Sequence, residues 1–218
     1  MIDRLNPKKG SGRYYILSNL KKAIKEIIEE ESSFGKILDY GAKDSPYKKL
    51  FKAKSISFHT ADFKNTGECM IELNDDGTIP VDSNSYDTVI SSQVLEHVED
   101  VQLYLSEIKR VLKNDGRLLI STHGYWKFHP DPHDYWRWTR EGLIKTLKMN
   151  GFISIKTYGI AGLSASGLQL FQDGISQKVP ARAKGVFFRL IAFLQKKVDG
   201  NRIDNIDSSV YVFFAKLK

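Results

Sequence analysis

The chain has 218 residues, of which 41% are hydrophobic and 27% are charged, a balance typical of a soluble globular domain and not of a disordered chain. No run of 18 uncharged apolar residues occurs, which argues against a membrane-spanning helix, and the polar N-terminus argues against secretion. The single cysteine, Cys69, excludes an internal disulfide and a multi-cysteine metal site. We therefore expect a cytoplasmic protein.

The formal net charge of +7 is unevenly distributed along the chain. Residues 1–60 and 101–218 are basic, whereas residues 61–100 are acidic. The basic ends favour an anionic partner, such as a phosphate-bearing substrate, nucleic acid or a membrane surface. An ordinary solvated basic surface is the alternative, because no run of Arg and Lys with interleaved aromatic residues occurs.

Helical and strand patterns alternate over the first 150 residues. Apolar residues spaced three and four apart predict helices over residues 14–31, 101–112 and 139–150. Thr139 is the expected N-cap of the third helix. Short apolar runs predict strands over residues 36–40, 55–62, 68–73, 86–92 and 117–122, and two further strands over residues 152–158 and 208–217. A turn is expected at residues 114–116, and residues 95–97 are expected to open a helix.

This alternation predicts a mostly parallel sheet with helices on both faces. Ligands of such sheets bind beyond the carboxyl ends of the strands. Residues 1–34 are predicted to be an N-terminal helical segment and residues 35–218 the main domain, with a variable helical insertion at about 160–207.

A helix predicted over residues 182–198 has an apolar stripe and an opposite basic stripe of Arg182, Arg189 and Lys196. The ordinary interpretation is a helix packed on the domain with its apolar stripe buried. The alternative is a cover for a lipid-linked acceptor or a peripheral contact with an anionic membrane. In that case Phe188 and Phe193 would stay partly exposed.

The segments that follow the first two predicted strands suit a nucleoside-like ligand. Gly41 lets the backbone approach a ligand closely. Asp39 and Asp62 end the first and the second strand, and a carboxylate at the end of the second strand accepts hydrogen bonds from a ribose diol. An acid at a strand end is common, so this feature alone does not identify a ligand.

Four segments together resemble the ordered motifs of class I S-adenosylmethionine-dependent methyltransferases, closest to the type 11 branch. They read ILDYGAKDSPYKKLF, TADF, IPVDSNSYDTVISSQVLEHVEDV and EIKRVLKNDGRLLIST. The resemblance implies a Rossmann-like, seven-stranded, mostly parallel sheet with a reversed last strand. It also implies a methyltransferase that uses S-adenosylmethionine as its cofactor.

The same resemblance implies cofactor contacts for residues that follow the first four strands. Near the methionine part they are Asp39, Tyr40 and Gly41; near the ribose and adenine they are Asp62, Phe63, Asn74 and Asp75; at the end of the fourth strand they are Ser92 and Gln93. The loop of the family usually reads Gly-x-Gly, whereas this chain has Lys43 at the second glycine. A residue other than glycine at this position is expected to reshape the turn. A lysine near the sulfonium of the cofactor is also electrostatically unfavourable unless it points to solvent or pairs with Asp44.

The segment HGYWKFHPDPHDYWRWTREGL, residues 123–143, is rich in aromatic residues and histidine. Similar family members have a comparable run here, which implies a wall and lid for the methyl acceptor. Candidate general bases for a hydroxyl acceptor are His129 and His133. Candidate acceptor-binding residues are Tyr125, Trp126, Tyr135, Trp136 and Arg137. The alternative is a rigid aromatic plug with surface histidines, and no metal site is expected because no strong ligand spacing occurs.

The predicted function is transfer of a methyl group to an oxygen or nitrogen of a small or carrier-linked acceptor, such as a sugar, a lipid-linked intermediate or another metabolite. The basic ends leave an RNA or protein methyltransferase as one alternative, so a nucleic acid partner is not excluded. Lys43 leaves a non-catalytic binding protein of the same fold as another. A nicotinamide dehydrogenase is disfavoured, because Gly-x-Gly-x-x-Gly is absent at residues 41–46.

Overall fold

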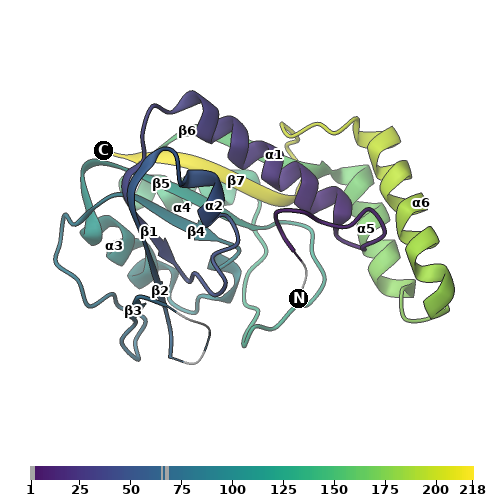
Figure 1. Cartoon of the computed structure of the whole chain (residues 1–218), viewed down its shortest axis with the longest axis horizontal. Coiled ribbons are helices and arrows are strands. Elements are labelled where there is room, and N and C mark those ends of the chain that lie inside the picture. Colours follow the sequence, from purple (N-terminus) through teal and green to yellow (C-terminus); the bar gives the residue numbers. More distant parts are fainter. Residues whose placement is uncertain (1–2, 65, 67–68) are drawn as a thin grey trace.

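The computed structural model describes residues 3–64, 66 and 69–218, and its centre is one seven-stranded sheet (Figure 1). The strands are β1 (Gly35–Tyr40), β2 (Ser55–Asp62), β3 (Ile71–Glu72), β4 (Tyr86–Ser92), β5 (Leu112–His123), β6 (Phe152–Gly162) and β7 (Ser208–Leu217). Their order is β3-β2-β1-β4-β5-β7-β6, and β7 is antiparallel to both of its neighbours. The predicted fold class, a Rossmann-like sheet with a reversed last strand, is confirmed.

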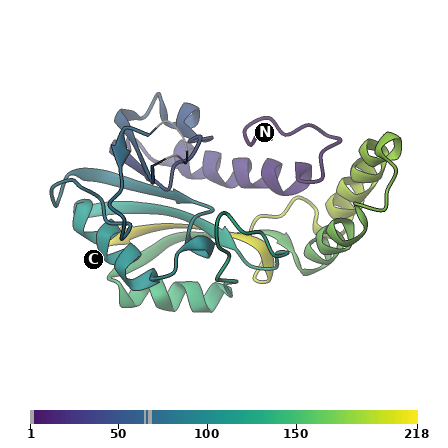
Figure 2. The same ribbon diagram turned by 90° about the horizontal axis from the view of Figure 1, so that it is seen from below.

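Helices cover both faces of the sheet (Figure 2). They are α1 (Tyr14–Glu30), α2 (Lys48–Phe51), α3 (Val101–Val111), α4 (Arg140–Met149), α5 (Leu163–Ile175) and α6 (Ala181–Asp199), with a short 3-10 turn η1 (Leu95–His97). Helix α1 lies on one face, and α3 and α4 lie on the other. Two apolar cores result, one on each side of the sheet, because alternate strand residues point to opposite faces.

Some predicted boundaries differ from the structure. The predicted strand at 68–73 contributes only Ile71–Glu72, and residue 68 lies outside the described residues. The predicted turn at 114–116 is a bulge within β5, where Asp115 has φ +63°. Leu95–His97 form a separate turn, and α3 begins later because the Asp100 side chain caps it by accepting from Leu103 N.

The predicted N-cap of α4 is confirmed, since Thr139 Oγ1 accepts from Gly142 N at 3.1 Å. Helix α5 was not predicted. Its sequence, LSASGLQLFQDGI, mixes Gly, Ser and Gln with apolar residues, and the spacing shows no apolar stripe facing the domain.

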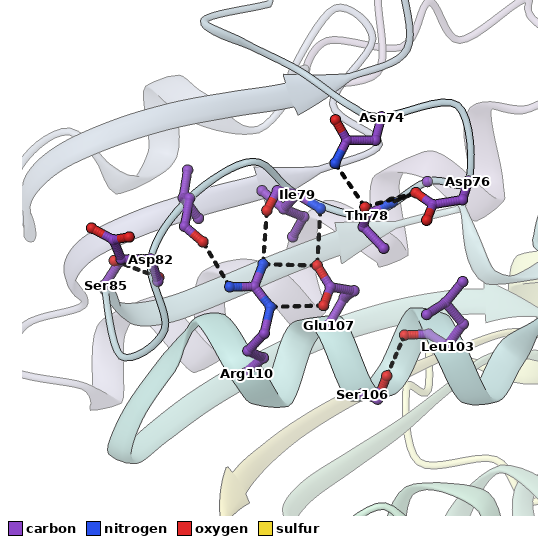
Figure 3. Close-up of polar contacts among 12 residues, drawn as sticks. Asn74, Asp76, Thr78, Ile79, Asp82, Ser85, Leu103, Ser106, Glu107 and Arg110 are labelled. Atoms are coloured by element: carbon purple, nitrogen blue, oxygen red, sulfur yellow. Dashed lines mark hydrogen bonds and ion pairs between the residues drawn. The ribbon is translucent and has the colours of Figure 1, made fainter.

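An ion pair between Glu107 and Arg110 on α3, here called the clamp, binds the backbone of residues 79–81 (Figure 3). Glu107 accepts from Arg110 Nε at 2.7 Å and from the backbone N–H of Ile79 at 2.9 Å. Arg110 also donates to the carbonyls of Ile79 and Val81, at 2.7 and 2.6 Å. The clamp therefore holds residues 79–81 in place, together with the turn at 74–78 that leads into them.

Helices α5 and α6 form a hairpin at the end of the molecule, beyond the sheet (Figures 1 and 2). The hairpin leaves the carboxyl end of β6, and the chain returns from it to the start of β7. Because His123, the last residue of β5, pairs with Val210 near the start of β7, the hairpin stands at the same edge of the sheet as the carboxyl end of β5. No helix among the described residues is long and apolar enough to cross a membrane.

Candidate functional site

The carboxyl ends of β1, β2 and β4 meet at one edge of the sheet, because β1 pairs in parallel with both of the others. Gly41 follows β1 with φ +77°, and a Cβ there would lie 2.7 Å from the side chain of Val94. Only glycine fits this backbone and this contact without strain. The loop after β1 is thus closely packed on the residues that follow β4.

Asp39 is buried at the end of β1, and its carboxylate accepts from Ser45 Oγ at 2.5 Å. Burial raises the pKa of Asp39 to about 7; the bond from Ser45 opposes this rise and the nearby charge of Asp62 adds to it. The charges of Lys48 and Arg4 also act to lower this pKa but offset burial only in part. A cationic ligand at this edge would therefore stabilise ionised Asp39 further.

Asp62 is buried at the end of β2 and accepts two backbone hydrogen bonds. Its Oδ2 accepts from Lys43 N at 2.6 Å, and its Oδ1 accepts from Phe63 N at 2.8 Å. Each carboxylate oxygen has about two acceptor positions, so among the described residues one position on each oxygen remains for a ligand. Two adjacent acceptors are what a diol requires.

Lys43 stands where the family loop has its second glycine, and it adopts φ +44°. Its side chain forms an ion pair with Asp131 of the loop after β5, at 2.7 Å. The Lys43 side chain is 48% exposed to solvent, and its ionic partner is Asp131 and not Asp44. Lys43 instead links the loop after β1 to residues 124–139.

Tyr40 is buried and stacks on Tyr104, with ring centroids 4.3 Å apart. Its hydroxyl donates to the carbonyl of Gly77 at 2.5 Å. Gly77 also lies beside Phe63, since a Cβ on Gly77 would be 3.5 Å from the tip of the Phe63 ring. Phe63 is 44% exposed, so an apolar surface is available next to Asp62.

The two residues predicted near the adenine, Asn74 and Asp75, are exposed in the turn before the clamp. Asn74 Nδ2 donates to Thr78 Oγ1 at 2.8 Å, within that turn (Figure 3). Ser92 is the last residue of β4 and Gln93 follows it. Their side chains each lie 3.2 Å from Ser121 Oγ on β5. Gln93 takes φ +59°, which turns the chain sharply at the end of the strand.

A buried acid that the sequence interpretation missed anchors the loop of residues 124–139. Glu96 Oε2 accepts from Thr122 Oγ1 at 2.8 Å, and Oε1 lies 2.9 Å from His123 Nδ1. Burial acts to raise the pKa of Glu96, but His123 and the hydrogen bonds outweigh it and lower that pKa. The backbone carbonyl of Glu96 also accepts from the N–H groups of Tyr135 and Trp136. The Leu-Glu-His motif that contributed to the family resemblance was the available signal for Glu96.

His129 lies in the middle of a cluster of imidazole rings. Its ring centroid is 5.6 Å from that of His123 and 5.2 Å from that of His97. Burial lowers the pKa of His129, and the two neighbouring histidines lower it further. Its Nδ1 is buried and has no hydrogen-bond partner among the described residues. The lowered pKa favours the neutral form of His129, and a neutral imidazole with an unpartnered nitrogen is what a general base requires.

His133 is exposed, and its carbonyl contacts His97 Nδ1 at 2.5 Å. Arg137 makes an ion pair with Asp134 and donates to the carbonyls of Trp126, Lys127 and Trp136. All five N–H groups of its guanidinium are engaged in these bonds. Arg137 therefore shapes the loop and has no N–H group left for a ligand.

The predicted aromatic residues of the loop take different positions. Trp126 stacks on His123 at 4.3 Å, and the Arg13 guanidinium covers its ring at 4.6 Å. Tyr125, Tyr135 and Trp136 are each about 40% exposed, and Trp136 Nε1 donates to Val98 O.

A groove of about 850 Å³ opens between the start of α3 and α4. Trp136, Arg137 and Trp138 form part of its lining, with Glu99, Asp100, Val101, Gln102, Thr139, Gly142 and Thr146. None of the residues predicted to bind the cofactor lines this groove.

A family described as "Methyltransferase domain" matches residues 51–120, about a third of the chain. The matched segment begins in α2 and ends in β5, so it includes Asp62 and the residues that follow β4. No curated protein matches the sequence.

Solved structures with the same fold cover nearly the whole chain at low sequence identity. A SAM dependent methyltransferase from Aquifex aeolicus is 13% identical with a TM-score of 0.58, covering 95% of this chain and 93% of its own. Phosphoethanolamine N-methyltransferase 2 from Haemonchus contortus, crystallised with S-adenosyl-L-methionine, is 18% identical with a TM-score of 0.57; the match covers 92% of this chain and 52% of that one. The [4+2]-cyclase SpnF is 15% identical with a TM-score of 0.56, covering 90% and 80%.

Proposed function

We propose that this protein, a class I S-adenosylmethionine-dependent methyltransferase of the type 11 kind, methylates an oxygen or nitrogen of a small or carrier-linked acceptor. The observation that carries the proposal is the pair of free acceptor positions on Asp62, at the strand end that the family match includes. When bound, S-adenosylmethionine supplies an electrophilic methyl group on a sulfonium sulfur.

The residues at the carboxyl ends of β1, β2 and β4 suit this cofactor. Asp62 would accept hydrogen bonds from the two ribose hydroxyls, and the exposed face of Phe63 would cover the adenine. Asp39 would stabilise the positive charge of the amino acid part, because its ionised form is buried and Lys48 and Arg4 offset that burial only in part. Gly41 lets the loop after β1 pack on Val94, and Ser92 and Gln93 would border the ligand from the end of β4.

The loop of residues 124–139 would hold the acceptor. The ion pair between Lys43 and Asp131 brings this loop to the loop after β1, where the methyl group would be presented. His129 would accept the proton from an acceptor hydroxyl, since its lowered pKa favours the neutral form and its Nδ1 has no partner among the described residues. Among the loop histidines we assign this role to His129 and not to the exposed His133. Tyr125, Tyr135 and Trp136 offer exposed aromatic surface for the acceptor, and positioning in a dry pocket would lower the barrier.

Calorimetric titration with S-adenosylmethionine and with S-adenosylhomocysteine tests the cofactor site. We expect Asp62→Ala to weaken binding by more than tenfold, about 1.4 kcal/mol, without unfolding the protein. Asp82→Ala, which removes an exposed carboxylate outside the site, is the matched control and should bind normally. Equal affinity of Asp62→Ala and the unaltered protein would reject the ribose role of Asp62.

Transfer of a labelled methyl group to fractionated small-molecule and lipid extracts tests the role of the loop. We expect His129→Ala to lower transfer by about a hundredfold while cofactor affinity stays within about twofold. His133→Ala should reduce transfer much less. A larger loss of methyl transfer in His133→Ala than in His129→Ala would assign the role of general base to His133.

A second candidate is a ligand-binding or other non-methylating role on the same fold. Lys43 favours this candidate. Its backbone N–H donates to the Asp62 carboxylate, and its side chain pairs with Asp131 in the loop of residues 124–139. Failure of the unaltered protein to bind either S-adenosylmethionine or its demethylated product would support this candidate over the first.

A further inference from the structure

The α5–α6 hairpin places large apolar side chains outward. Along α6 the exposed apolar residues recur three or four positions apart, so they share one side of the helix. The exposed apolar residues of the hairpin are Leu163, Leu170 and Phe171 on α5 and Val186, Leu190, Phe193, Leu194 and Val198 on α6. Most of these side chains are more than half exposed, which is unusual for so many neighbours on one surface.

The inner side of the hairpin is correspondingly polar. Gln169 and Gln172 both donate to the carbonyl of Gly12, and Gln195 donates to the carbonyl of Ala165. These amides are buried because they bond backbone carbonyls inside the molecule. Ile191 and Ala165 are the buried apolar residues of the hairpin. Since polar groups occupy the other buried positions, most of the large apolar side chains of the two helices are left exposed. None of the helices and strands described covers them.

The exposed charged side chains of the hairpin are positive. Its exposed cations are Lys178, Arg182, Arg189, Lys196 and Lys197. Its only two acids point inward: Asp173 pairs with Arg13 at 2.7 Å, and Asp199 accepts from the Tyr15 hydroxyl at 2.8 Å. Arg182, Arg189 and Lys196, spaced by seven, follow one border of the apolar side of α6.

We infer that the outward face of α5 and α6 docks on an anionic lipid bilayer. The apolar side chains would enter the boundary between headgroups and acyl chains, and the bordering cations would meet lipid phosphates. A second copy of the chain is a poorer occupant, because two-fold symmetry would bring these cations against one another. This inference stands independently of the proposed methyl transfer.

The docked hairpin would lie close to the candidate acceptor loop. Arg13 joins the two regions, since its guanidinium pairs with Asp173 on α5 and covers the ring of Trp126 in the loop. Both the hairpin and the loop stand at the carboxyl edge of the sheet. A membrane under the hairpin would therefore present lipid-linked molecules near the site.

Flotation of the full chain with vesicles tests this inference. At low salt we expect binding to vesicles of phosphatidylcholine that contain a minor share of phosphatidylglycerol, and strong weakening at high salt because the charges are screened. Replacing Arg182, Arg189 and Lys196 together by Gln should lower the affinity by about a hundredfold, at about 1 kcal/mol for each cation. The matched control replaces the exposed Lys52, Lys145 and Lys148 by Gln and should bind like the unaltered chain.

A second pair of variants separates apolar insertion from charge alone. Leu190→Gln with Phe193→Gln should abolish flotation, whereas Ile56→Gln with Met149→Gln, which removes exposed apolar residues elsewhere, should not. Circular dichroism and calorimetric titration with S-adenosylmethionine check that each variant is folded.

Absence of flotation by the folded, unaltered chain at any salt concentration would overturn the inference. So would a concentration-dependent dimer that the Leu190→Gln, Phe193→Gln variant disrupts. If the unaltered chain binds S-adenosylmethionine but does not float with vesicles, only membrane docking is rejected. If it floats with vesicles but does not bind S-adenosylmethionine, only the proposed methyl transfer is rejected.

Discussion

The segment from α3 to β5 and the α5–α6 hairpin differ in how many large apolar side chains they leave exposed. On α3, Leu105 and Ile108 are fully buried, and the polar Glu107 is satisfied by Arg110 and the backbone of Ile79. On α6, Leu190 and Phe193 are each 54% exposed, while Gln195 is buried. The first region is explained by contacts within the chain. The exposed apolar side chains of α6 are not covered by any of the described residues. This difference points to a partner outside the chain.

The largest expected effect is on the α3 side of this comparison. Leu105→Ala removes a fully buried side chain from the core beside the sheet. We expect the free energy of unfolding to fall by about 2–5 kcal/mol, because the cavity adds to the lost burial. Urea denaturation followed by circular dichroism measures the change. A loss below about 1 kcal/mol would show that this core is loosely packed.

The second effect concerns the buried acid at the site, where Asp39 has a pKa raised to about 7. Between about pH 4 and pH 7 the folded chain keeps a proton on Asp39 that the unfolded chain has lost. The free energy of unfolding from this group is therefore largest below pH 4 and falls as the pH rises to 7, by on the order of 2–4 kcal/mol.

Asp39→Asn should remove this part of the pH dependence and stabilise the protein at pH 8 relative to the unaltered chain. Thermal unfolding at pH 5 and pH 8 is the measurement. Asp44→Asn, at an exposed position of the same loop, is the control. An unchanged pH profile in Asp39→Asn would assign the dependence to other groups.

A smaller effect is expected at the clamp. Glu107→Ala leaves Arg110 and the Ile79 N–H without their acceptor, and we expect a loss of about 2 kcal/mol. Lys109→Ala, an exposed neighbour on α3, should change stability by less than about 0.5 kcal/mol. Chemical denaturation of both variants makes the comparison, and equal values would mean that the clamp adds nothing to stability.

The smallest effect sharpens the contrast between the two regions. Leu190→Ala makes the same chemical change as Leu105→Ala, but on the exposed side of α6. We expect the free energy of unfolding to change by less than about 0.5 kcal/mol in the absence of vesicles. A loss of about 2 kcal/mol or more, as for a buried leucine, would show that Leu190 packs inside the protein, and it would remove the apolar basis of the docking surface.

Much of the sheet was predictable, because short apolar runs and the turns between them are local features. The ends of β2 and β4, where Asp62, Ser92 and Gln93 lie, followed from the same patterns. The partners of these residues did not. Lys43 pairs with Asp131, 88 residues later, and nothing in the local sequence of either residue indicates the other.

The loop of residues 124–139 shows the same division. Its wealth of aromatic residues and histidine marked it as a functional candidate. The sequence did not separate His129, with its free buried nitrogen, from the exposed His133, nor did it reveal that Arg137 is fully engaged in the loop. Burial and hydrogen-bond partners depend on residues that are distant along the chain.

The sequence by itself determined the order of strands and helices, the fold class and the resemblance to methyltransferases, since these depend on periodicity and on short motifs. Only the tertiary structure decided which face of α6 is buried. Of its predicted apolar stripe Ile191 is buried, but Leu190 and Val198 are each 54% exposed. Gln195 points inward, bonded to the Ala165 carbonyl. The sequence periodicity of a helix defines its faces. Which face packs on the protein depends on the hydrogen-bonding groups of the neighbouring elements, which are distant along the chain.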